Sequence, residues 1–334
     1  MNHKKIVILH QDVPKEAPPD DKDVLIAAEN IFQILEQENF DPLILPVDDD
    51  FQFISVLKTI NPFLVVNLVE SFMGSSFAAA MIPKILQSLH LPHTGNSSQC
   101  LLLTTDKMLT KHLLLKANLP TPHADKYPTP ETFVPGWYIF KPLREDASLG
   151  ISDENIHYVN SAKEALDMLH TFETKFSIPF FLERFIEGRE FNVSVISEKG
   201  SPRVFQPAEI LFTGDVNPYR IMDYESKWIK SSQRYKQSYR TFNFPKTDQP
   251  LIEQLIHLTE ACWELTGLEG YARVDFRVDQ KNNPWILEVN ANPCSSPDSG
   301  FIAAAQNEGL SYNELMLHLI YEAFHDDQKR DPSL

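Results

Sequence analysis

Apolar positions in the first part of the chain form short continuous runs that alternate with stretches of helical spacing. Continuous runs are typical of buried parallel strands, and a repeat of three and four residues is typical of helices packed on them. The alternation predicts a parallel α/β layer over about the first 93 residues. Its predicted elements are a strand at 5–10, a helix capped by Asp23, a strand at 43–47, a helix at 51–60, a strand at 63–69 and a helix at 76–90.

The pattern is less regular after this layer. Two short apolar runs on either side of Gly188 predict a pair of strands. The segment at 209–239 is polar and aromatic without a clear period, and it is long for a loop in a compact domain, so we expect a lid there. The other predicted elements are helices at 106–118, 161–172, 249–265 and 312–324 and a strand at 137–140.

The segment at 270–293 reads GYARVDFRVDQKNNPWILEVNANP and predicts a β-hairpin, two β-rich runs around a polar turn. Because side chains alternate along a strand, Asp275 shares a face with Arg273. On the return strand Glu288 shares a face with Asn290. The opposite face of that strand is expected to hold Leu287 and Val289.

The position of the turn decides which of these side chains are paired. A turn at Lys281 and Asn282 places Asp275 across from Glu288. Two carboxylates directly opposite repel each other, so this pairing makes sense if a cation lies between them. Hard oxygen ligands of this kind suit Mg²⁺. A turn one residue later would instead pair Arg277 with Glu288 as an ordinary ion pair, and the residues alone leave both arrangements open.

Two lysines stand at positions from which a side chain can reach a phosphate. Lys107 lies in the first turn of a predicted helix, where the helix dipole disfavours it, so it is either a solvated lysine or one aimed at a phosphate. Lys141 ends a strand and precedes a small-residue turn with Ser148 and Gly150. Such a turn can fold backbone N–H groups and a hydroxyl over phosphates.

Two acids flank the linker that contains Gly188. Glu183 ends the first apolar strand, and Glu190 begins the second. A linker of this kind can present backbone groups to an adenine edge while an acid reaches the ribose hydroxyls. The alternative is that both acids are solvated at strand ends.

The composition restricts the partners that we expect. A formal charge of −16 repels nucleic acid and anionic lipid, so neither a nucleic-acid nor a membrane partner is expected. No apolar stretch approaches the ~20 residues needed to span a bilayer. The three cysteines, Cys100, Cys262 and Cys294, form no CxxC pair and fit a reducing compartment, so we expect the cytoplasm.

An Arg-x-Asp strand followed by a strand that ends in Glu-x-Asn-x-x-Pro resembles the metal hairpin of the ATP-grasp superfamily, in particular of the D-alanine:D-alanine ligases. The other motifs follow in the order expected of that family. The resemblance implies an α/β fold with an N-terminal Rossmann-like domain at 1–95. It further implies an α+β ATP-grasp part, with a central subdomain carrying the phosphate loop at 96–180 and a C-terminal subdomain carrying the lid and the metal hairpin at 181–334.

The resemblance also assigns roles to individual residues. Those matched to nucleotide binding are Lys107, Lys141, Ser148, Glu183, Arg184, Phe185, Ile186, Glu190 and Lys227. Those matched to catalysis are Arg273, which stabilises the reacting carboxylate, the lid lysine Lys227 and Ser148. Those matched to metal ligands are Asp275, Glu288 and Asn290.

The activity that the resemblance implies is the ATP-dependent joining of a carboxylate to an amine. Transfer of the γ-phosphoryl group to the carboxylate gives an acylphosphate, which the amine attacks, and ADP and phosphate are released. The implied cofactors are ATP and two Mg²⁺ ions, with Mn²⁺ as an alternative. Arg273 and the backbone N–H near Cys294 would hold the oxyanion, and a closed lid would exclude water.

The chain departs from the D-alanine ligases at several positions. Its first loop, at 11–16, has no glycine, Ala147 replaces the first of two phosphate-loop serines, and Cys294 replaces a glycine. Trp228 follows the lid lysine, where a tyrosine is usual. Because the nucleotide and metal residues match while these positions differ, we expect a shifted amino-acid or small-peptide substrate.

A substrate ammonium in a closed cleft needs a fixed acid, and Glu16 and Glu70 are the candidates, since both lie near ends of first-domain strands. Two other functions are weighed: a strict D-alanine:D-alanine ligase of cell-wall synthesis, and a catalytically silent ATP-binding regulatory protein. Retention of Arg273 with all three metal ligands argues against the silent protein. A homodimer is one oligomeric state that the sequence allows.

Overall fold

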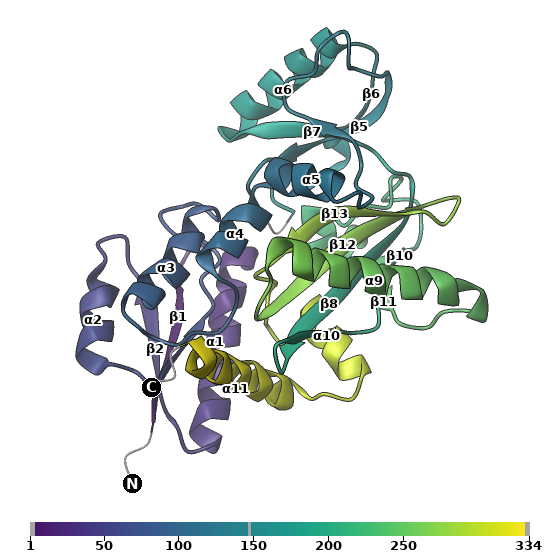
Figure 1. Cartoon of the computed structure of the whole chain (residues 1–334). Coiled ribbons are helices and arrows are strands. Elements are labelled where there is room, and N and C mark those ends of the chain that lie inside the picture. The colour runs from purple at the N-terminus through teal and green to yellow at the C-terminus, as the bar shows by residue number, and fades with distance from the viewer. Residues whose placement is uncertain (1–3, 146–147, 331–334) are drawn as a thin grey trace.

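The computed structural model describes residues 4–145 and 148–330. Three sheets form three lobes, which Figure 1 shows in purple to blue, in teal and in green. The comparison of Ala147 with a family serine falls outside the described residues.

The first lobe is the parallel α/β layer that the sequence predicts. Its sheet has the order β2-β1-β3 with all pairs parallel, and buried apolar side chains such as Ile8 and Val66 fill its strands. The elements are β1 (Lys5–Gln11), α1 (Pro19–Gln37), β2 (Asp41–Val47), α2 (Gln52–Ile60), β3 (Leu64–Asn67) and α3 (Met81–Ser88).

Two predicted helix starts in this lobe are wrong. Helix α1 begins at Pro19 rather than after Asp23, because proline is well suited to the first helical position, and Asp23 lies inside the helix. The helix expected from residue 76 begins as a short 3₁₀ turn at Ala78–Ala80 and becomes α-helical only at Met81.

The second lobe carries a smaller antiparallel sheet of order β4-β7-β5-β6, covered on one face by α6. Aromatic side chains such as Phe140, Phe172 and Phe180 form its core. Helices α4, which the sequence did not predict, and α5 connect the first lobe to it (Figure 1). The bounds are α4 (Ser98–Thr105), α5 (Lys107–Lys116), β4 (Ala124–Asp125), β5 (Gly136–Pro142), β6 (Ile156–Val159), α6 (Ala162–Phe176) and β7 (Phe180–Arg184).

The third lobe is built on a sheet of order β11-β10-β8-β12-β13, with β9 paired to β8. Helix α9 packs on this sheet through residues such as Leu255 and Trp263. The bounds are β8 (Gly188–Glu198), β9 (Ser201–Val204), β10 (Ala208–Phe212), β11 (Ser238–Thr241), α9 (Gln249–Thr266), β12 (Tyr271–Asp279), β13 (Pro284–Asn290), α10 (Gly300–Asn307) and α11 (Tyr312–Arg330).

The segment at 209–239, expected to be one long loop, contains regular structure. Its ends are the paired strands β10 and β11, and between them lie α7 (Tyr224–Trp228) and α8 (Gln233–Lys236). The side chains of Asp223 and Ser232 cap these two short helices. Its role as a lid stays a prediction.

The last helix connects the third lobe to the first. Leu315 and Leu319 of α11 share one core with Ile6 and Ile31 of the first lobe. Division into domains at 95/96 and 180/181 stays a prediction; β7 runs across the second boundary. Within residues 4–145 and 148–330, no helix combines the length and the apolar character needed for a membrane span.

Candidate functional site

The hairpin of β12 and β13 places two carboxylates face to face. Asp275 lies directly opposite Glu288, and Arg273 lies opposite Asn290. Arg277 lies opposite Trp285, so the alternative pairing of Arg277 with Glu288 is wrong.

The register of the two strands shifts by one residue between Asp275 and Phe276. Phe276 pairs with Ile286, whereas the adjacent Asp275 pairs with Glu288, so Leu287 is an extra residue in a β-bulge. Leu287 therefore lines the same cavity as Glu288 instead of joining Val289 in the core, which corrects the expected alternation.

A cavity lies between the second and third lobes, lined by strands of both sheets. Of the residues matched to the site, only Arg184 does not line it; its guanidinium turns away, toward the carbonyl of Pro135 at 3.2 Å. The matched residues that line it are Lys107, Lys141, Ser148, Glu183, Phe185, Ile186, Glu190, Lys227, Arg273, Asp275, Glu288 and Asn290.

Lys107 is not a solvated surface lysine. Its side chain is 8% exposed, and its ammonium donates to the carbonyl of Glu145 at 2.6 Å and lies 3.7 Å from the Glu288 carboxylate. Asp106 caps α5 by accepting from the backbone N–H of Leu109, which fixes the helix turn that carries the lysine.

Glu183 is buried between two lysines. Its side chain is 1% exposed, and its carboxylate binds Lys141 at 2.6 Å and also Lys111. Lys111 donates to the hydroxyl of Thr121 at 2.9 Å. Burial raises the pKa of Glu183, but the two ammonium groups outweigh burial and hold this pKa below its ordinary value. The solvated alternative for this acid is wrong. Lys111 is a site residue that was not predicted, although it follows Lys107 by four residues and so lies on the same helix face.

Glu190 is also buried, which excludes the solvated alternative for it. It accepts from Arg277 at 3.1 Å and from the backbone N–H of Met222 at 3.3 Å. Burial raises the pKa of Glu190, although Arg277 acts in the opposite direction. Arg277, which the sequence analysis did not assign, also donates to the carbonyl of Ile186 at 3.0 Å and thus supports the linker between β7 and β8.

The matched metal ligands lie together at the end of the hairpin. Asp275 accepts from Arg273 through both oxygens, at 2.7 and 2.8 Å, and from Asn192 at 2.7 Å. Within the described ranges, no group of three or more His, Cys, Asp or Glu side chains could hold a metal ion. Two carboxylates and the amide oxygen of Asn290 nevertheless fit Mg²⁺, which takes one or two carboxylates and fills other positions with water and phosphate.

Cations around Glu288 keep it ionised. Burial raises the pKa of this carboxyl, but neighbouring lysines and Arg273 outweigh it and lower the pKa to about 2. Glu288 is therefore a carboxylate at neutral pH, as a hard metal ligand must be. Burial and the nearby Arg273 lower the pKa of Lys227.

A second cavity adjoins the first and shares with it Lys227, Arg273 and Asn290. It lies against the first lobe, and Glu70 lines it while Glu16 does not. The other polar and aromatic residues at its wall include Asp20, Asp21, Trp228 and Cys294.

Cys294 contributes a half-buried thiol to this second cavity. The thiol donates to the Asp23 carboxylate at 2.7 Å and lies 3.1 Å from the hydroxyl of Ser296. Burial raises the pKa of Cys294, and Glu70 and Asp23 raise it further. The Cys294 side chain in the cavity wall is therefore a protonated thiol at neutral pH.

Several known proteins are similar to this chain. The family model "D-ala D-ala ligase C-terminus" matches residues 133–321. The D-alanine–D-alanine ligase of Bordetella pertussis is 30% identical over 246 residues, which cover 71% of this chain and 72% of that protein. An uncharacterized protein of Sinorhizobium fredii is 27% identical over 258 residues, covering 76% of this chain and 72% of that one.

The fold comparison extends over the whole chain. A crystal structure of D-alanine–D-alanine ligase from Bacillus anthracis complexed with ATP has a TM-score of 0.74 at 18% identity, covering 99% of this chain and 100% of that one. The structural match agrees with the three-lobed fold. The chain belongs to the D-alanine–D-alanine ligase family of ATP-grasp enzymes.

Proposed function

We propose that this chain joins an amino acid or small peptide other than D-alanine to an amine-bearing amino acid or peptide. The general activity, ATP-dependent ligation of a carboxylate to an amine, is that of its family. The observation that carries the proposal is the adjacency of the two cavities. Lys227, Arg273 and Asn290 line both, so a nucleotide in one and a carboxylate in the other would meet at these residues.

The first cavity binds ATP in this proposal. Lys107 and Lys141 neutralise phosphate charge, and Ser148 covers the phosphates. Glu190 takes the ribose hydroxyls, while backbone groups of the linker at Phe185 and Ile186 face the adenine. Arg184 contributes its backbone alone, because its side chain lies over the Tyr138 ring, outside the cavity.

Asp275, Glu288 and Asn290 are the proposed Mg²⁺ ligands, for two ions, with Mn²⁺ as a substitute. When bound, the metal would neutralise developing phosphate charge. Arg273 orients Asp275 through its two hydrogen bonds and also lines the second cavity, where it holds the carboxylate that reacts. The backbone N–H near Cys294 is the second donor proposed for the oxyanion.

The second cavity holds the amino-acid or peptide substrates. Glu70 is the better placed of the two acids considered for the substrate ammonium, because it lines this cavity and Glu16 does not. Trp228 gives the wall a bulky indole. D-Alanine should therefore be a poor substrate.

The test is product analysis by mass spectrometry after incubation with ATP, Mg²⁺ and a mixed pool of amino acids and dipeptides. We expect a product other than D-alanyl-D-alanine, with ADP release. Dominance of D-alanyl-D-alanine, with kcat/KM at or above ~10⁴ M⁻¹s⁻¹, would identify a strict D-alanine ligase. ATP binding without ADP release over the whole pool would identify the silent regulatory protein.

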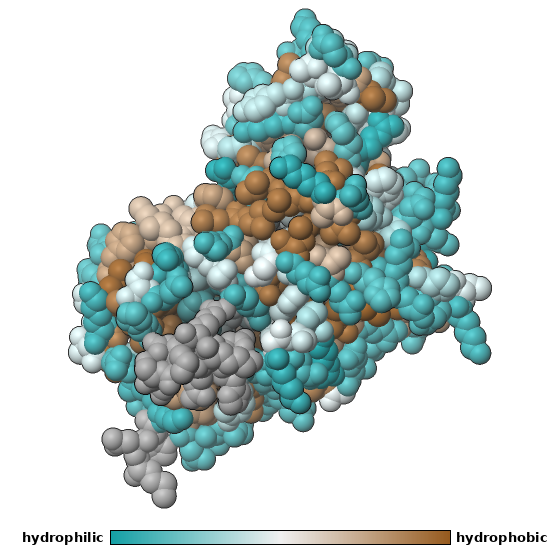
Figure 2. Space-filling view, in the orientation of Figure 1, coloured by the Kyte–Doolittle hydropathy of each residue, from teal (hydrophilic) through white to brown (hydrophobic). Residues whose placement is uncertain are grey.

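A homodimer is the proposed assembly. Figure 2 shows one face of the molecule, with an apolar area near its middle, around α4 and α5. Leu102, Leu109 and Leu115 are exposed apolar residues of these helices, and clustered exposed apolar residues are typical of interaction sites. Light scattering should give twice the chain mass, and Leu109→Asp should return the protein to a monomer.

A further inference from the structure

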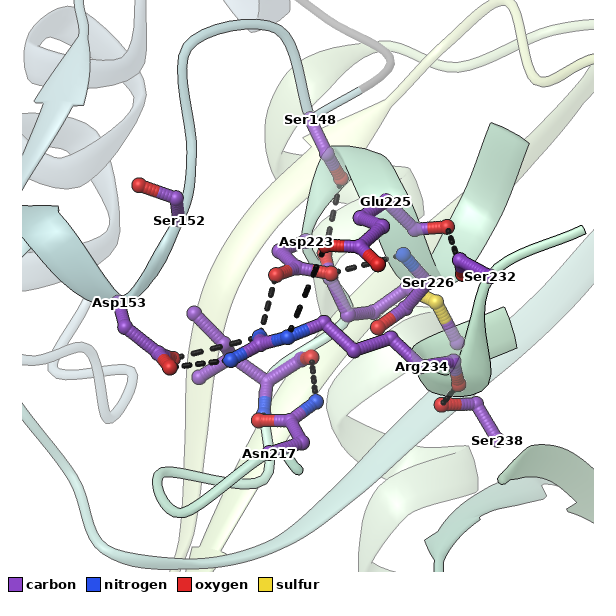
Figure 3. A network of polar contacts seen from close by, with 12 residues as sticks. Ser148, Ser152, Asp153, Asn217, Asp223, Glu225, Ser226, Ser232, Arg234 and Ser238 are labelled. Carbon is purple, nitrogen blue, oxygen red and sulfur yellow. Dashed lines mark hydrogen bonds and ion pairs between the residues drawn. The ribbon is translucent and has the colours of Figure 1, made fainter. Parts of the chain in front are cut away.

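Arg234 joins two segments that approach the first cavity from different lobes. Figure 3 shows its guanidinium between the carboxylates of Asp153 and Asp223. Asp153 follows the phosphate loop on the second lobe, whereas Arg234 and Asp223 belong to the segment at 209–239 on the third. The Arg234 side chain is 12% exposed and that of Asp223 is 3% exposed, whereas the Asp153 side chain, at 30%, is partly open to water.

On the lid side, the contact fixes the helix that carries Lys227. Arg234 binds one oxygen of Asp223 at 2.5 Å, and the other oxygen accepts from the backbone N–H of Ser226 at 2.8 Å. Asp223 is thus the N-cap of α7, and Lys227 follows it by one helical turn. A movement of Arg234 would therefore change the direction in which Lys227 points into the two cavities.

On the other side, the contact fixes the end of the phosphate loop. Arg234 binds both oxygens of Asp153, and the loop touches the lid again where the hydroxyl of Ser148 donates to the carbonyl of Met222 at 2.9 Å. Asn155 braces the loop from behind by donating to the carbonyl of Gly150 at 2.8 Å. Loop and lid are thus in contact at both ends of the loop segment at 148–153.

We propose that Arg234 is a positioning residue that holds the phosphate loop and the lid together, so that Ser148 and Lys227 face the same phosphates and the nucleotide leaves slowly. This role of Arg234 rests on the proposed function, because the phosphates are those of ATP or ADP. A planar guanidinium is suited to this task because its forked donors can engage two carboxylates at once, which a lysine ammonium does with less geometric control.

The test compares Arg234→Gln with Asp153→Asn, Arg234→Lys and the double variant Arg234→Gln/Asp153→Asn. Arg203→Gln is the matched control, because Arg203 also bridges two acids, Glu198 and Glu308, but does so outside both cavities. Two quantities are measured: the dissociation rate of a fluorescent ADP analogue, and the ratio of phosphate released to ligated product formed.

Arg234→Gln should speed dissociation roughly tenfold, because the lid would separate from the phosphate loop more often and release the nucleotide. It should also raise the ratio of phosphate to product, because water reaches the reactive intermediate when the lid is loose. Arg234→Lys should lie between wild type and Gln, and adding Asp153→Asn to Arg234→Gln should have little further effect. The control should match wild type in both measurements.

A lower melting temperature with unchanged dissociation rate and unchanged ratio would reduce Arg234 to a structural residue and overturn the proposal. So would a full additional effect of Asp153→Asn in the double variant. The dissociation measurement needs nucleotide binding alone, so it decides the role of Arg234 even if no ligated product is found and the proposed reaction fails.

Discussion

The ammonium of Lys141 lies 2.6 Å from the carboxylate of Glu183 at the wall of the first cavity. The same carboxylate also binds Lys111 from the protein interior, so one negative charge faces two positive ones. This excess of positive charge beside the cavity favours an anionic ligand. It also makes Glu183 the residue on which the balance of charge depends.

Glu183→Gln should destabilise the protein by about 3–5 kcal/mol, because it leaves two ammonium groups without their buried partner. Lys111→Met should cost clearly less, because the pair of Lys141 with Glu183 stays balanced one to one. Urea unfolding of the two variants measures the difference. If Lys111→Met costs as much as Glu183→Gln, the charge balance is not what stabilises this cluster.

Lys141→Ala should weaken ATP binding by at least ~1.5 kcal/mol, the contribution of a charge-assisted hydrogen bond. Calorimetric titration with ATP measures this change. Lys175→Ala is the control, because Lys175 pairs with Glu154 at an exposed position and lines neither cavity. Equal ATP affinity of the Lys141 variant and the control would remove Lys141 from the nucleotide site.

Glu288→Gln should lower ADP release by roughly a hundredfold or more, because the hairpin would keep its shape but lose one of its two opposed carboxylates. The fold, measured by circular dichroism, should stay intact. Calorimetric titration with Mg²⁺ in the presence of a non-hydrolysable ATP analogue should show weaker metal uptake. Near-normal ADP release at saturating Mg²⁺ would contradict the metal assignment.

Asp279 should make the hairpin turn sensitive to acid. Its carboxylate accepts hydrogen bonds from Asn283, from the backbone N–H of Lys281 and from Trp285. The small burial of the group raises the pKa, but these bonds outweigh it and lower the pKa from 3.8 to about 2. A carboxyl whose pKa is depressed in the folded state stabilises it above the ordinary pKa, and this contribution is lost as pH falls from 3.8 toward 2.

Asp279→Asn should therefore lose less stability than wild type over that pH range, as followed by thermal melting. Asp49→Asn is a matched control, since it removes the same charge from an exposed turn. Parallel melting curves for wild type and Asp279→Asn across the range would refute this role.

Cys294 should resist alkylation by iodoacetamide at about pH 8, because burial, Glu70 and Asp23 all raise its pKa and the thiolate is the reactive form. Mass spectrometry of the intact protein gives the number of labelled thiols. Asp23→Asn should increase the labelling of Cys294, whereas unfolding in urea should expose all three cysteines. Rapid labelling of Cys294 in the native wild type would contradict the protonated thiol.

Much of the fold could be predicted because it depends on local patterns. The parallel layer follows from continuous apolar runs, and the hairpin from two β-rich runs around a polar turn. The opposed pair of Asp275 and Glu288 was among the arrangements that alternation allowed. The placement of Lys107 and Glu183 could not be predicted from local patterns. Only the burial of both side chains in the folded chain excludes the solvated alternatives.

Other features depend on contacts between distant parts of the chain. Arg277 reaches Glu190 on a neighbouring strand, and Arg234 reaches Asp153 on another lobe. The spacing of residues along the sequence does not predict such pairs, because they form only when the sheets are assembled. The start of α1 differs for another reason: Asp23 is of a residue type that caps helices, but Pro19, which suits the first helical position, begins the helix.

The extra residue at Leu287 bears on how this hairpin can change over evolutionary time. An insertion in a regular strand moves every later side chain to the opposite face. Here the bulge absorbs the insertion: without Leu287, the ladder that pairs Phe276 with Ile286 would run on unbroken and would still bring Glu288 opposite Asp275. A single codon gained after Ile286 thus adds an apolar side chain to the cavity wall while both carboxylates keep their places.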